Sequence, residues 1–185
     1  MDRSAILGPS NVEILSNHLS RNSAKMVAFG TLVEAIKSAF PNIHEDNYAE
    51  ISDFLLEYLN ELGSIRPNEI ALLSVAKRQK VRSESIVDQA VMWHGYLRLA
   101  ARLKEYRPDD WRDALSTLSN PYKHGDDYEN DLFNRENPVW AEKEVIAQGK
   151  TGPRVVNNRQ SRQGAFEVLA QVTATPTKGQ ALLIA

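Results

Sequence analysis

Acidic side chains form the cluster in this sequence that comes nearest to a catalytic site. Four carboxylates fall within the six residues 126–131 of a polar segment, and His124 stands close by. They are Asp126, Asp127, Glu129 and Asp131. Carboxylates can hold a divalent metal for phosphodiester hydrolysis, but the spacing does not follow a calcium-binding EF-hand loop, and catalysis needs groups that converge in a pocket. We therefore expect a solvated acidic loop, with a metal-dependent nuclease as the less favoured alternative.

Two basic intervals offer a different chemistry, which is contact with phosphate. The first is the run KRQKVR, which carries Lys77, Arg78, Lys80 and Arg82. Cationic side chains that neutralise phosphates supply the salt-dependent part of DNA affinity. The alternative is that the run is a solvated connector ahead of the next helix.

The second basic interval lies between Val145 and Phe166, where the sequence has no acidic residue. Guanidinium and amide side chains, which it is rich in, suit both phosphates and base edges. Its candidate DNA-binding side chains are Lys150, Arg154, Arg159 and Arg162. The alternative is that these groups hydrogen-bond the turn around Trp140 and the preceding acidic loop. We hypothesise that this interval docks beside the long helix described next.

The element expected to position these groups is one long helix that begins near Ser83 or Ser85 and ends before Pro108. Its buried stripe is predicted to consist of Ile86, Ala90, Trp93, His94, Leu97 and Ala101. These residues recur at helical spacing on one face. We expect His94 to be a hydrogen-bonded core histidine rather than a metal ligand, because no second histidine or carboxylate stands three or four residues away.

Other apolar patterns complete a mainly α fold. Helical stripes cover residues 29–40, 48–62, 111–118 and 161–172, and residues 71–75 fit a short helix better than a buried strand. Short strands around a turn at 149–153 give a β-hairpin-like segment near residues 143–157. We predict a single helical domain of about five or six helices over residues 11–172, with a flexible lead-in at 1–10 and a flexible tail at 173–185.

Composition narrows the functional classes. The 185 residues include no cysteine, which excludes disulfides, thiol catalysis and cysteine-ligated zinc. The net charge of −2 means that any DNA contact must be made by a local basic patch. Neither a secretory signal nor an apolar run of the roughly 18 residues that span a bilayer is visible. We expect a cytoplasmic protein that is not an enzyme, uses no cofactor and contacts no membrane.

Four stretches together resemble the C-terminal half of the DndB family of DGQHR-domain proteins. They are LSRNSAKMVAFGTLVEAI, RSESIVDQAVMWHGYLRLAARL, DDWRDALSTL, and RENPVW followed by NNRQSRQGAFEVL. The DGQHR motif that names the domain does not occur in this chain. The resemblance implies a role beside a DNA sulfur-modification (phosphorothioation) system, in which family members bind promoter DNA and regulate the modification genes.

The resulting expectation is a regulatory protein that binds double-stranded DNA. It would be a truncated or split member of the family. The alternative is a helical protein–protein interaction module without its own DNA affinity. Its partner would be a DGQHR-containing protein or another copy of this chain.

Overall fold

The computed structural model describes residues 7, 10–16, 19–20, 22–125, 128–150 and 152–177. It contains seven α-helices in those residues and three small sheets of two strands each, which confirms the mainly α prediction and adds to the expected number of helices. The helices are α1 (Phe29–Ala39), α2 (Glu45–Ile65), α3 (Val75–Glu84), α4 (Ala90–Tyr106), α5 (Trp111–Ser116), α6 (Pro138–Glu142) and α7 (Arg159–Val172), and a 3-10 turn, η1, follows α5 at Thr117–Ser119. The strands are β1 (Val12–Glu13), β2 (Val27–Ala28), β3 (Pro121–His124), β4 (Tyr128–Asp131), β5 (Ile146–Gly149) and β6 (Gly152–Val155).

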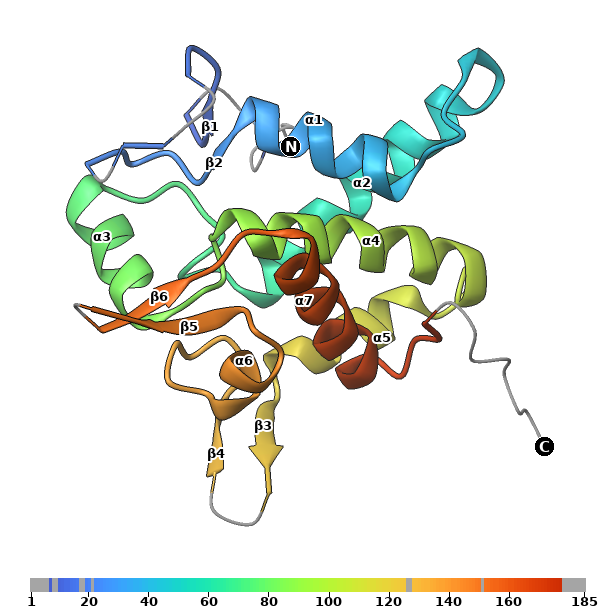
Figure 1. Cartoon of the computed structure of the whole chain (residues 1–185). Coiled ribbons are helices and arrows are strands. Elements are labelled where there is room, and N and C mark those ends of the chain that lie inside the picture. Colours follow the sequence, from blue (N-terminus) through green and yellow to red (C-terminus); the bar gives the residue numbers. More distant parts are fainter. Residues whose placement is uncertain are drawn as a thin grey trace.

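Helix α4 is the centre of the fold. It packs against α1 and α7, while α2 packs against α5 (Figure 1). Ten of its seventeen residues are buried, so the helix is apolar around most of its circumference, as expected for the middle of a core. Two tyrosine hydroxyls that become buried there find partners: Tyr96 donates to the Val87 carbonyl, and Tyr58 donates to the Tyr96 carbonyl, each at 3.0 Å.

The start of α4 differs from the predicted position near Ser83 or Ser85. Helix α3 ends at Glu84, a short non-helical segment with a turn at 87–88 follows, and α4 begins only at Ala90. Within that segment the Ile86 amide donates to the Phe133 carbonyl at 3.0 Å, and Ile86 and Val87 are fully buried. Tertiary pairing with the chain near Phe133 therefore outweighs local helix propensity at these residues.

The other helix predictions have mixed outcomes. Helices at 29–39, 45–65, 111–116 and 159–172 are confirmed, and α7 begins with a capping box between Asn158 and Ser161. The short helix favoured for residues 71–75 is wrong, because 71–74 form no regular element and the helix starts at Val75. The run KRQKVR is thus part of a helix and not a connector.

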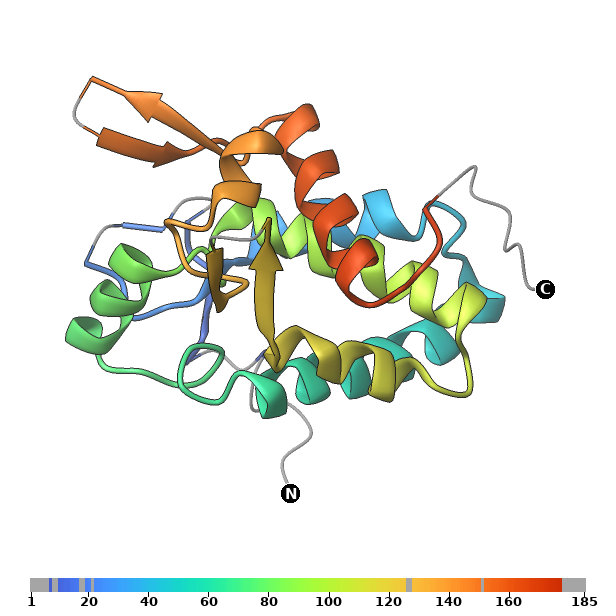
Figure 2. The same cartoon turned by 90° about the horizontal axis from the view of Figure 1, so that it is seen from below.

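Two β-hairpins project from the helical body. The β5–β6 hairpin confirms the segment predicted near residues 143–157, and Figure 2 shows that it extends beyond the helices. The antiparallel β3–β4 hairpin lies where a polar loop was expected, with Tyr122 opposite Asn130. A parallel pair, β1–β2, brings Val12 beside Val27 ahead of α1.

Both ends of the predicted domain fall partly outside the described residues. Most of the lead-in at 1–10 and residues 178–185 of the tail lie there. Thr173 and Thr175 are buried, and the Thr175 amide donates to the Ala170 carbonyl at 2.8 Å, so packing extends a few residues beyond α7. Among the described residues, none of the helices combines the length and the hydropathy required to cross a membrane.

Candidate nucleic-acid interface

Arg78, which the sequence places among the candidate phosphate contacts, is fully buried inside the molecule. Its guanidinium donates to the backbone carbonyls of Glu69 at 2.6 Å, Ala71 at 2.7 Å and Ala24 at 3.4 Å. A fourth bond, at 3.4 Å, reaches the carboxylate of Asp88. These donors are all directed inward, so Arg78 cannot reach a phosphate and its assignment to the nucleic-acid surface is wrong.

Arg82 joins the same buried cluster from the next turn of α3. Its Nε donates to Asp88 Oδ2 at 3.2 Å, and its terminal nitrogens donate to the carbonyls of Ser23 and Lys25. Asp88 is 2% exposed, and burial raises the pKa of its carboxyl although two guanidinium groups oppose that rise. We name Arg78, Arg82 and Asp88 the arginine cluster. It fastens α3 to the chain segment before β2 and so serves the fold.

Lys77 and Lys80 are the members of that run that face solvent. Both are exposed on α3, and Lys80 has Glu84 as an ion-pair neighbour at 4.0 Å. The structure therefore divides the first basic interval into two inward arginines and two outward lysines. Only the lysines remain candidates for a contact with phosphate.

The second basic interval is arranged differently. Lys150 follows β5 at the turn of the hairpin, Arg154 lies on β6 opposite Ala147, and both are exposed. The hairpin is held near its turn by Arg135, whose guanidinium donates to the carbonyls of Arg82 and Pro153, each at 3.0 Å. The β5–β6 hairpin is therefore fixed to the body while its basic side chains point to solvent.

Helix α7 continues this surface, because Arg159 is exposed at its first position. We call Lys150, Arg154 and Arg159 the ribbon surface. Asn158 caps the helix by accepting from the Ser161 amide at 2.9 Å, and the first turn carries no acidic residue. A helix N-terminus with this composition favours anions. No ion pair joins the three ribbon side chains to the described part of the chain.

Arg162 turns from the ribbon surface toward α1. It donates to Asn157 at 2.8 Å and forms an ion pair with Glu34, with Nη1 2.5 Å from Oε1. That hydrogen bond holds the pKa of the Glu34 carboxyl below its ordinary value. The bond to Glu34 differs from the alternative prediction, in which the arginines of this interval would bind the Trp140 turn and the acidic loop.

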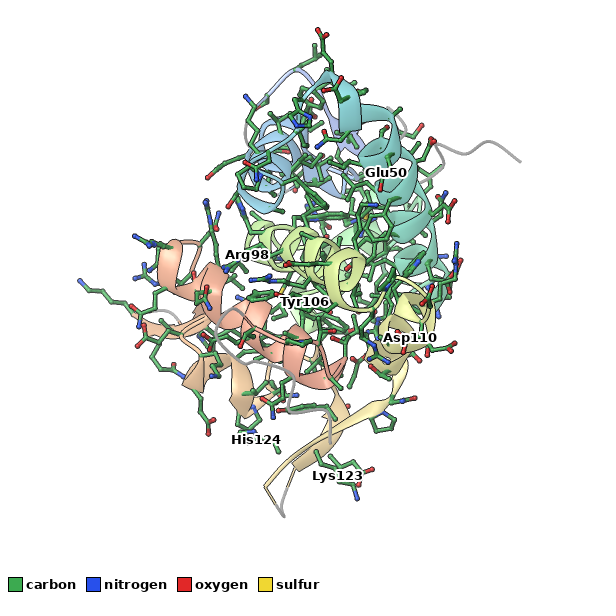
Figure 3. The ribbon with its side chains drawn as sticks, turned by 90° about the vertical axis from the view of Figure 1, so that its right-hand side faces the viewer. Glu50, Arg98, Tyr106, Asp110, Lys123 and His124 are labelled. Atoms are coloured by element: carbon green, nitrogen blue, oxygen red, sulfur yellow. The ribbon has the colours of Figure 1, made fainter. Side chains whose placement is uncertain are left out.

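A pocket of about 890 Å³ lies between α1, α4 and α7. It is lined by Glu34, His94, Arg98, Arg159, Arg162 and Gln163, among others. Figure 3 shows Arg98 on the side of α4 that faces α7. The hypothesis that the second basic interval docks beside the long helix is therefore confirmed for its helical part, whereas Lys150 and Arg154 lie on the projecting hairpin.

His94 is buried as predicted, but its hydrogen bonding differs from the expectation. Its Nε2 has no hydrogen-bond partner among the residues that the structure describes, and the nearest acidic atom is Glu34 Oε2 at 4.0 Å. Burial lowers the pKa of His94 to about 4, with Arg162 adding to the effect, so the ring is neutral near pH 7.

The acidic residues considered for metal chemistry do not gather around one point where the chain is described. Asp126 and Asp127 lie outside the described residues. Asp131 accepts a hydrogen bond from Arg66 at 2.5 Å, and Glu129 pairs with Lys123 at 3.4 Å across the β3–β4 hairpin. Within the described ranges no group of three potential metal ligands occurs.

Sequence reasoning did not identify Glu34 as a site residue, and it did not place His94 or Arg98 in a pocket. Glu34 and Arg162 are 128 positions apart in the sequence, and nothing in either local pattern indicates their contact. One local signal was present for Arg98: it lies four positions after His94, hence on the same helix face. Two polar residues on one helix face, beside an apolar stripe, indicate that this edge of the helix faces a polar environment.

Comparison with known proteins identifies a family. A family model described as DndB, DNA-sulfur modification-associated, matches residues 1–175. Searches of curated proteins and of solved structures returned no match. Because the family model covers nearly the whole chain, the protein belongs to the DndB family and is associated with a DNA sulfur-modification system.

Proposed function

We propose that this protein is a regulator that binds double-stranded DNA within its sulfur-modification system, and that the ribbon surface makes the main contact. Family membership supports the association with a DNA sulfur-modification system, and the resemblance described above implies promoter binding. The observation that carries the assignment to these residues is the projecting β5–β6 hairpin, whose basic side chains have no acidic neighbours along the chain from 146 to 165.

The shape of the hairpin fits this role. A two-stranded ribbon is narrow enough to enter the major groove of B-form DNA. Lys150 at the turn and Arg154 on β6 would then contact the phosphates or bases on either side. Arg159, in the first turn of α7, would reach a phosphate of the adjoining backbone together with the amides of that turn.

The local character of this surface is consistent with the net charge of −2 for the whole chain. A weakly acidic protein is not drawn to DNA over its entire surface, so binding would depend on a few cations and on orientation. We propose further that the protein acts by binding alone, without catalysing a reaction on DNA.

The test is a titration of labelled duplex DNA from the promoter of the adjacent modification genes, followed by fluorescence anisotropy over a series of salt concentrations. The triple variant Lys150→Ala, Arg154→Ala, Arg159→Ala is compared with wild type. Loss of three phosphate contacts should reduce the slope of log affinity against log salt by about 3. A triple variant that removes three cations elsewhere, Lys37→Ala, Arg112→Ala, Lys123→Ala, should keep the wild-type slope to within about 1.

Two outcomes contradict the proposal in different ways. If wild type has no affinity for the duplex at low salt, the protein does not bind DNA by itself. The interaction-module alternative then stands, and co-purification with a DGQHR-containing partner would support it. If wild type binds and both triple variants weaken binding equally, DNA binding is retained but the ribbon surface is the wrong assignment.

A further inference from the structure

The pocket between α1, α4 and α7 contains more positive than negative charge. Of the described residues that line it, three are arginines, from α4 and α7, and one is a carboxylate, Glu34 from α1. The guanidinium of Arg98 lies 4.4 Å above the ring of Phe166, a cation–π contact that helps to position it. No described carboxylate is within ion-pair distance of Arg98, and Glu167 acts on it only from farther away.

His94 gives an independent indication of a ligand. The side chain is 3% exposed, and its Nε2 has no hydrogen-bond partner among the described residues. Because buried polar atoms in folded proteins are nearly always bonded, this atom calls for a partner that enters the pocket. The Nε2–H form of the neutral ring would donate a hydrogen bond to such a partner.

Glu34 marks the position of an anionic group. One of its carboxylate oxygens lies 2.5 Å from Arg162 Nη1 and the other lies 4.0 Å from His94 Nε2. Its side chain is 59% exposed, so it can swing out into solvent and leave the donors behind. The protein's own carboxylate thus occupies the location that an external oxyanion would take.

We propose that this pocket binds a phosphate group through Arg98, Arg162 and His94 Nε2, and that the phosphate displaces Glu34 from Arg162. The planar fork of donors on each arginine matches the oxygens of a phosphate. The volume of about 890 Å³ also leaves room for a substituent on the phosphate. The phosphate belongs either to a free compound or to a DNA backbone that runs past Arg159. The free-compound form does not depend on the proposed DNA-binding function.

The first experiment is isothermal titration calorimetry of the full chain with inorganic phosphate, at constant ionic strength set with chloride. Glu34→Gln should bind phosphate about tenfold more tightly than wild type, because a competing negative charge is removed. Arg98→Met, which keeps an apolar contact with Phe166, should weaken binding by about tenfold. Arg112→Met is the matched control, because Arg112 also lies over an aromatic ring, that of Trp111, at 4.2 Å but far from the pocket.

The second experiment separates the two sources of phosphate. The phosphate titration and the duplex titration are both carried out with Glu34→Gln, Arg98→Met, and the hairpin variant Lys150→Ala, Arg154→Ala. If Arg98→Met loses inorganic phosphate and the hairpin variant keeps it, the site takes a free phosphate compound. If inorganic phosphate does not bind but Arg98→Met and Glu34→Gln shift DNA affinity in opposite directions, the site takes a backbone phosphate.

The proposal is overturned if Glu34→Gln and Arg98→Met, both folded by circular dichroism, leave phosphate binding and DNA binding unchanged. Failure of the ribbon variants to alter DNA affinity would instead contradict only the proposed function. If Arg98→Met does not fold, Glu34→Gln still tests the proposal. It is expected to bind phosphate more tightly, and loss of structure could not produce tighter binding.

Discussion

The two basic intervals, residues 77–82 and 150–162, look alike as sequences, but most of their arginines are placed differently in the structure. In the first, Arg78 and Arg82 point inward and bind backbone carbonyls and Asp88. In the second, Lys150, Arg154 and Arg159 are exposed on a projecting hairpin and a helix N-terminus. The comparison shows that an arginine-rich run does not by itself indicate a binding surface. A guanidinium with five donors can complete a core as well as it can bind an external phosphate.

The largest expected effect on stability comes from removing an inward-pointing arginine of the first interval. Arg78→Ala should lower the free energy of unfolding by about 3–5 kcal/mol, because it leaves the buried Asp88 and three backbone carbonyls with fewer partners. Urea denaturation followed by circular dichroism measures this change. The neighbouring Lys77→Ala should change the same quantity by less than about 0.5 kcal/mol. Equal effects of the two variants would show that Arg78 is not the buried member of the pair.

A second prediction contrasts Arg78, whose donors are bonded, with His94, whose buried Nε2 has no partner among the described residues. The pKa of His94 in the folded protein is about 4, below its ordinary 6.5, so the unfolded chain binds a proton first as the pH falls. Stability should therefore be lost between about pH 6.5 and pH 4, by up to about 3 kcal/mol from this group. Glu34, Arg98 and Arg162 are the charged groups that face it.

His94→Leu isolates the histidine contribution to this pH dependence. The variant should show a shallower decline in the free energy of unfolding over the same interval, as measured by urea denaturation at several pH values. Parallel curves for the variant and wild type would mean that other groups cause the decline.

A third prediction concerns the anchoring of the outward interval. A Cβ on Gly164 would lie only 2.3 Å from the carbonyl oxygen of Lys143, which is a backbone atom with little freedom to move. Gly164→Ala should therefore destabilise the protein by about 1–3 kcal/mol through overpacking between α6 and α7. Gln171→Ala, at an exposed position of the same helix, should be close to neutral. Thermal unfolding of the two variants gives the comparison.

The smallest effect on stability, and the sharpest on binding, is expected for charge reversal on the two surfaces. Lys150→Glu with Arg154→Glu should leave the free energy of unfolding unchanged and reduce the salt slope of DNA affinity by about 2. Lys77→Glu with Lys80→Glu removes the same number of cations from the outward face of α3. A larger loss of DNA affinity for the α3 pair would transfer the main contact from the ribbon surface to that helix.

The sequence predicted what depends on local periodicity. The apolar stripes of α1, α2 and α7 were readable because helix faces repeat every three or four residues. The β5–β6 hairpin was readable from Gly149 and Gly152 near its turn. In contrast, the β3–β4 hairpin was missed because its strands are polar and carry no alternating apolar pattern.

What the sequence did not predict depends on contacts between distant segments. Arg78 points inward because it binds the carbonyls of residues 24, 69 and 71. Every residue has a backbone carbonyl, so no sequence pattern indicates which carbonyls will accept these bonds. The pocket likewise requires α1 and α7 to meet across α4, with Glu34 opposite Arg162. Local patterns identify the helices but not which polar side chains they bring together.

The arginine cluster also links the stability of separate parts of the chain. Arg78 binds the carbonyl of Ala24, and Arg82 binds those of Ser23 and Lys25. The segment before β2 therefore cannot detach without leaving one buried and one partly buried guanidinium short of acceptors. This segment and α3 should therefore open as one cooperative unit. In native-state hydrogen exchange, the Met26 amide, which donates to Asn11, should exchange at the same free energy as the amides of α3.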